Sequence, residues 1–179
     1  MYILLLLFSI SCLKVPTNEE LVKKYSLKRG SDEGEVLKFK NNAQAEEFLK
    51  KLKSLSQQPD KQYRIITKGE TYEFIAERGI GLNIQIGDKS YGYLKAVLTG
   101  VVETEKNSEG KILIKSCQHT MGLVGVPLGT TLENVLTWHE INENKVKIFG
   151  KGIVKSKLLI GEIYTYSEEI KLVIEKEIN

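Results

Sequence analysis

The chain of 179 residues is 41% hydrophobic and 27% charged, with 26 lysines and arginines against 23 aspartates and glutamates. A chain of this length buries roughly two thirds of the surface that its unfolded form exposes, so a single domain needs neither a disulfide nor a metal ion to fold. The basic residues are scattered among acidic ones instead of forming a stripe, which argues against a nucleic acid as the partner.

The beginning of the chain predicts export. The apolar run from Tyr2 to Ile10 is shorter than the about 20 residues that span a bilayer, and it has the length of the apolar region in a secretory leader. Ser9 and Ser11 before Cys12 resemble the lipobox of bacterial lipoproteins, although no Lys or Arg precedes the run and Ser9 stands where Leu is usual. The resemblance implies a signal peptide over residues 1–11 and a diacylated Cys12. It also implies an extracytoplasmic protein on a bacterial cell membrane, inner or outer; the alternative is an apolar first strand in a cytosolic protein.

Residues 12–34 are polar and contain Pro16, which predicts a lipid-anchored tether with at most a short helix over Asn18 to Tyr25. A single α+β domain is expected over residues 35–179. If Cys12 carries lipid, Cys117 is the one thiol left in the mature chain, and no intramolecular disulfide can form.

The clearest helix is predicted over Asn41 to Ser56, after a short strand over Val36 to Phe39. Asn41 with Gln44 forms a capping-box pattern. Apolar residues follow at helical spacing: Ala45, Phe48, Leu49, Leu52 and Leu55. This stripe predicts a helix that covers one face of a sheet and leaves its lysines in solvent. A basic helix face laid against anionic lipid head groups is the alternative.

Antiparallel strands are predicted through the middle of the chain. Tyr63 to Thr67 and Tyr72 to Ala76 precede a region from Ile80 to Cys117 that contains three strands, with turns at Gly87-Asp88 and Asn107 to Gly110. The longest of these strands places small or apolar side chains on one face: Leu94, Ala96, Leu98, Gly100 and Val102. These residues are suited to a packed core. They would line an apolar cleft instead if the space beside the small side chains were not filled from the opposite side.

A glycine-rich apolar loop from His119 to Thr131 follows, without the Lys or Arg that a phosphate site needs. Thr130 and Glu133 form a capping-box pattern, which predicts a second, short helix. Terminal strands are predicted over Val146 to Phe149, Ile153 to Tyr166 and Ile170 to Ile178. The last segment also fits a helix, but its β-branched residues favour a strand.

Few residues are suited to catalysis. Cys117, His119, His139 and Glu140 would form a zinc-like set or a Cys-His nucleophile pair only if the fold brought them together. No hydrolase elbow, metalloprotease motif or dinucleotide fingerprint is present. We therefore expect a buried Cys117, no catalytic residue, no metal ion, no cofactor and no enzymatic activity.

From Glu35 to Ile178 the order of elements, together with the apolar Gly-Leu-Val-Gly-Val-Pro-Leu loop, resembles small bacterial proteins of the tubular lipid-binding (TULIP-like) type. The resemblance implies an α+β fold: a curved antiparallel β-sheet meander with one main amphipathic helix packed on it and a second short helix. A lipid-like or other apolar ligand would bind in a groove between helix and sheet. Candidate groove residues are Phe48, Leu52, Leu94, Ala96, Leu98, Gly100, Met121, Val124 and Leu128. The alternative function is a non-catalytic envelope protein without a small ligand, which binds a partner protein through a sheet edge or the Met121 to Leu128 loop.

Overall fold

The computed structural model describes residues 14–86, 89–125, 127 and 129–179. The predicted signal peptide over residues 1–11, the lipid-attachment residue Cys12, the turn at Gly87-Asp88 and the groove candidate Leu128 lie outside this part. Within it the chain forms two helices and nine strands, and most of the strand pairs are antiparallel. The fold is therefore a mixture of helices and mainly antiparallel sheet.

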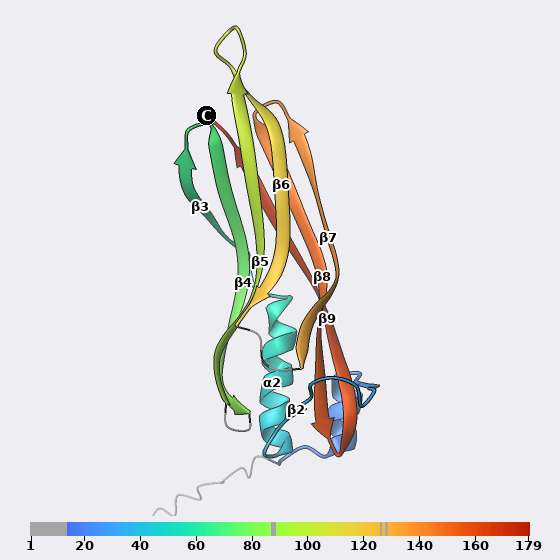
Figure 1. Ribbon diagram of the computed structural model, residues 1–179. Coiled ribbons are helices and arrows are strands. Elements are labelled where there is room, and N and C mark those ends of the chain that lie inside the picture. Colours follow the sequence, from blue (N-terminus) through green and yellow to red (C-terminus); the bar gives the residue numbers. More distant parts are fainter. Residues whose placement is uncertain (1–13, 87–88, 126, 128) are drawn as a thin grey trace, which may run out of the picture.

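The helices are short compared with the strands. The helices are α1 (Asn18–Lys24) and α2 (Asn42–Leu55), and two-residue strands precede α2 at β1 (Lys28–Arg29) and β2 (Leu37–Lys38). The long strands are β3 (Lys61–Lys68), β4 (Thr71–Ile86), β5 (Lys89–Lys106), β6 (Ile112–Val124), β7 (Thr130–Asn142), β8 (Lys145–Ile160) and β9 (Glu162–Glu177). At about 3.3 Å per residue, the sixteen residues of β8 span about 50 Å, which gives the molecule its elongated form in Figure 1.

The strands form two sheets, where the sequence predicted one curved sheet. One sheet has the order β3-β4-β5-β6, and the other has the order β1-β9-β8-β2 with β7 also paired to β8. The chain passes from the first sheet to the second between Val124 and Thr130 (Figure 1). Gly125 and Gly129 in this connection have φ angles of +73° and +72°, which side chains with a Cβ rarely adopt. The crossover therefore uses two of the glycines that the sequence pattern assigned to a loop, but residues 119–124 of that predicted loop belong to the strand β6.

The core lies between the two sheets and around α2. Every second residue of β5 and β8 is buried over most of their length, as alternating strands with one inner face require. Figure 1 shows α2 in the lower half, between the lower parts of β4 and of β8 and β9. Its buried side chains are Ala45, Phe48, Leu49, Leu52 and Leu55. The Asn41 side chain caps the helix by accepting a hydrogen bond from the backbone N–H of Gln44 at 3.0 Å.

Part of the predicted tether belongs to the folded body. Thr17 and Glu20 form a capping box at the start of α1, and α1 contributes Leu21, which is fully buried. Tyr25 and Leu27 are also buried, and β1 pairs with β9. The polar composition of the segment did not indicate this, because a single buried leucine in α1 and two buried residues just after it are enough to dock the segment. Neither helix of the described part has the length and hydropathy to cross a membrane.

The short helix predicted after Thr130 is wrong, because residues 130–142 form the strand β7. Its pairing with β8 shifts register between Glu133 and Leu136, where Asn134 adopts a φ of +51°. Such a bulge interrupts the alternation of a strand, so that apolar residues on the two sides of it acquire helix-like spacing. Glu133 accepts a hydrogen bond from Lys155 on β8 at 3.2 Å in place of its predicted capping role.

Other strand predictions change in their bounds. The predicted strand Tyr72 to Ala76 and the first strand of the region from Ile80 form one continuous strand, β4. The predicted strands at Val146 to Phe149 and Ile153 to Tyr166 are divided differently, because β8 runs unbroken through Gly150 and Gly152. The chain reverses instead at Gly161, which has a φ of +76° and lies between the paired residues Ile160 and Glu162. The strand prediction over the last segment, against a helix, is confirmed by β9.

Candidate functional site

The predicted groove residues lie in a packed interior. Five of them have no exposed surface, and these are Phe48, Leu52, Leu94, Ala96 and Leu98, while Met121 is 8% exposed. The space beside Gly100 is filled from the opposite sheet, since a Cβ built on this glycine would lie 2.1 Å from Cδ1 of Ile148 on β8. Val124, in contrast, is exposed at the end of β6. The small side chains of β5 thus leave no apolar cleft at this level of the core.

The opposite sheet shows the same interdigitation. A Cβ on Gly150 of β8 would lie 2.9 Å from Cδ1 of Leu98 and 3.0 Å from Sδ of Met121. The glycines of one sheet therefore receive large side chains of the other, which is how two sheets fill the space between them to the density of a core.

Gly100→Ala is predicted to lower the free energy of unfolding by about 1–3 kcal/mol, because the added methyl group must displace the end of Ile148. Ile148→Val removes the Cδ1 atom in question, so in the Gly100→Ala background it should restore part of the lost stability. Urea denaturation of the two single variants and the double variant measures this coupling. A Gly100→Ala protein as stable as the wild type would mean that space is available there.

The structure brings two of the four chemistry-bearing residues together. Nε2 of His119 on β6 lies 3.0 Å from Nδ1 of His139 on β7. In the described residues no three His, Cys, Asp or Glu side chains gather closely enough to hold a metal ion. Cys117 is only partly buried, where a buried side chain was expected. This burial raises the pKa of its thiol to about 11, so the thiol is protonated at neutral pH and is not poised as a nucleophile. The geometry therefore gives no support to a Cys-His hydrolase.

A different surface feature was not predicted from the sequence. Leu136 and Trp138 on β7 point outward with 61% and 45% of their surfaces exposed. The Trp138 indole stacks on the ring of its cross-strand partner Phe149, with centroids 5.0 Å apart and planes 9° from parallel. We call Leu136, Trp138 and Phe149 the outer apolar face. This face was missed because the sequence pattern predicted a helix for the segment. In a strand, Leu136 and Trp138 are two residues apart and therefore lie on the same side.

Charged residues of both signs border the outer apolar face. Lys147 of β8 lies over the Phe149 ring, with Nζ 5.6 Å from the centroid, and pairs with Glu175 of β9 at 3.2 Å. Lys151 pairs with Glu169 at 2.7 Å. These ion pairs are largely exposed, so they contribute little to stability and remain available to rearrange.

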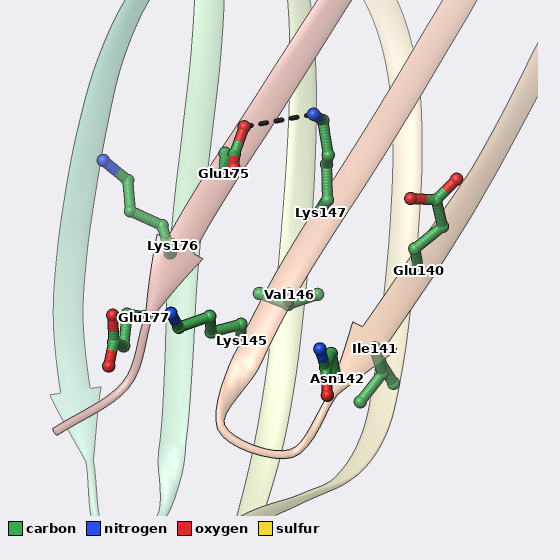
Figure 2. A pocket seen from close by; sticks show the side chains of 9 residues that line it. All are labelled: Glu140, Ile141, Asn142, Lys145, Val146, Lys147, Glu175, Lys176 and Glu177. Atoms are coloured by element: carbon green, nitrogen blue, oxygen red, sulfur yellow. Dashed lines mark ion pairs between the residues drawn. The ribbon is translucent and has the colours of Figure 1, made fainter.

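A polar pocket of about 630 Å³ adjoins this face at the end of the molecule where β7 turns into β8 (Figure 2). Its lining is Glu140, Ile141, Asn142, Lys145, Val146, Lys147, Glu175, Lys176 and Glu177. Figure 2 shows the Lys147 and Glu175 side chains pointing toward one another across the strands. The three lysines and three glutamates of the lining compensate each other in charge, so the pocket has no net charge that would favour an anion or a cation.

Comparison with known proteins finds no matching family model, curated protein or solved structure.

Proposed function

We propose that this chain is a non-catalytic, lipid-anchored protein of a bacterial cell envelope that binds a partner protein through the outer apolar face. The observation that carries the proposal is the exposure of Leu136 and Trp138, side by side on β7 and supported by the Phe149 ring. Exposed clusters of large apolar side chains rimmed by charges are typical of protein interaction sites. A rigidly stacked tryptophan is also the residue type most often found to dominate binding energy.

The packed interior favours this function over a lipid groove. Burial of an acyl chain requires an apolar cavity of several hundred Å³, whereas Gly100 and Gly150 are filled by side chains of the facing sheet. In this proposal α2 is an amphipathic helix packed on the sheets, and it fills the lower part of the core instead of roofing a groove. The apolar-ligand function stays a prediction that no contact described above favours.

The position of the face agrees with an anchored role. The lipid anchor itself rests on the pattern around Cys12, and the described chain begins at the lower end of the molecule in Figure 1. Trp138 belongs to the part of β7 nearer the opposite end, where β7 turns into β8. An anchor at residue 12 would therefore hold the outer apolar face on the half of the protein that lies away from the membrane.

Trp138→Ala is predicted to weaken binding to the partner by about 30-fold or more, which corresponds to the 2 kcal/mol or more of a binding hot spot. The partner is first captured in the native cell by a photo-crosslinking residue at position 136, with position 159 as the matched control. Leu159 is also an exposed leucine of the same sheet, 38% exposed, but it lies at the opposite end. Affinity is then measured for wild type, Trp138→Ala and Leu159→Ala.

Equal capture from positions 136 and 159 would contradict the proposed face, as would an unchanged affinity of the Trp138→Ala protein. Because Trp138 is half-exposed and on an edge strand, its truncation is compatible with folding, which thermal unfolding of each variant verifies.

A further inference from the structure

The two sheets meet along two lateral edges, and these edges are joined differently. On one side, both backbone groups of Val173 on β9 are bound: its N–H donates to Oδ2 of Asp60 at 3.2 Å, and its C=O accepts from Nε2 of Gln62 at 3.0 Å. On the other side β6 and β7 run close together, but no backbone ladder joins them in the described residues. There the backbone N–H of Ile114 on β6 donates to the C=O of Glu143 in the turn between β7 and β8 at 3.3 Å, and the imidazoles of His119 and His139 form a second link.

Both histidines face the space between the sheets. His119 is paired with Gly100 and His139 with Ile148, two residues whose contact across the core was described above. His139 lies at the open edge and is exposed, while His119 is half-buried. Small ions can therefore reach the point where the two ring nitrogens approach each other.

The spacing of the two nitrogens fits a metal ion as well as a hydrogen bond. Metal–nitrogen bonds of 2.0–2.1 Å to atoms 3.0 Å apart enclose an angle of about 94° at the metal. This is close to the angle between neighbouring ligands in the tetragonal complexes of Cu²⁺ and Ni²⁺. A tetrahedral Zn²⁺ site would require the nitrogens to separate to roughly 3.3 Å.

The remaining ring nitrogen of His119 suits the same arrangement. Its Nδ1 atom is buried and has no hydrogen-bond partner among the described residues. A proton on Nδ1 would leave the lone pair of Nε2 for the metal. The metal would replace the proton that the two rings share.

We propose that His119 and His139 form a two-histidine site for a divalent late first-row transition metal ion, and that the bound ion clamps the β6 edge of one sheet to the β7 edge of the other. Because the described residues offer no third ligand close by, water completes the coordination shell. The inference is independent of the proposed partner protein, since the two histidines face inward and Trp138 faces outward.

The test uses the full chain in detergent, purified without a histidine tag and freed of metal with a chelator. Ni²⁺ is the probe because it does not oxidise thiols, and Mg²⁺ is the control ion because imidazole is a poor ligand for it. At free Ni²⁺ about 100-fold above the dissociation constant, the midpoint of thermal unfolding should rise by about 5–10 °C. Isothermal titration should give one Ni²⁺ per chain.

His139→Gln should abolish the rise and the binding, and the substitution is compatible with folding because residue 139 is exposed. Glu140→Gln is the matched control, because its side chain lies on the other face of β7 and should leave both effects intact. No rise in the wild type, or the same rise in the His139→Gln protein, would overturn the proposal.

Discussion

Phe48→Ala is expected to lower the free energy of unfolding by about 3–5 kcal/mol, the usual cost of removing a fully buried phenylalanine ring. Phe48 has no exposed surface and lies on the inner side of α2, with the Phe39 ring 5.6 Å away between centroids. Loss of this ring leaves a cavity between α2 and the sheets that the surrounding side chains only partly fill. The corresponding fall in the melting temperature is about 6–20 °C for a domain of this size.

Phe149→Ala is the matched control, since it removes the same ring from the outer apolar face. Phe149 is partly exposed and makes its main aromatic contact with Trp138, so the expected loss is about 1–2 kcal/mol. Urea denaturation with a common slope for the three proteins gives both values. Equal losses for the two variants would show that Phe48 borders open space, as a residue lining an empty ligand groove would.

The strands were predictable because their signals are local. The alternation through Leu94, Ala96 and Leu98 describes an inner face whatever lies opposite, and Asn107 forms its turn with groups a few residues away, its N–H donating to the C=O of Lys111 at 2.9 Å. The bulge at Glu133 to Leu136 removed that signal locally, since one interruption of the alternation makes a strand resemble a helix.

Features that depend on two distant segments were not predictable. Whether Gly100 borders a cleft or a filled core is decided by Ile148 on the other sheet, and no local pattern relates the two residues. The approach of His119 to His139 likewise depends on the register of two separate groups of strands. The sequence supplied the right residue types for a pair but carried no information on their distance.

Leu21→Ala is expected to lower the free energy of unfolding by about 2–5 kcal/mol, although Leu21 belongs to the segment that composition assigned to a tether. The leucine is fully buried, and α1 is held to α2 by polar contacts as well. The Asn42 side chain of α2 donates to the backbone C=O of Pro16 at 2.9 Å and to Oδ1 of Asn18 at 2.7 Å. Removal of the Leu21 side chain should loosen this junction together with the lower part of the core.

Val15→Ala is the control within the same segment, because Val15 is 55% exposed and its truncation should change stability by less than about 0.5 kcal/mol. Chemical denaturation of the two variants distinguishes a docked helix from a free tether. In a free tether, neither substitution would change the free energy of unfolding.

A docked α1 also limits the reach of the proposed anchor. Only residues 13–16 then separate Cys12 from the capping residue Thr17, a span of at most about 18 Å. A large loss for Leu21→Ala would show that α1 is docked, so that a lipid on Cys12, if it is present, would hold the folded body within this distance of the membrane surface.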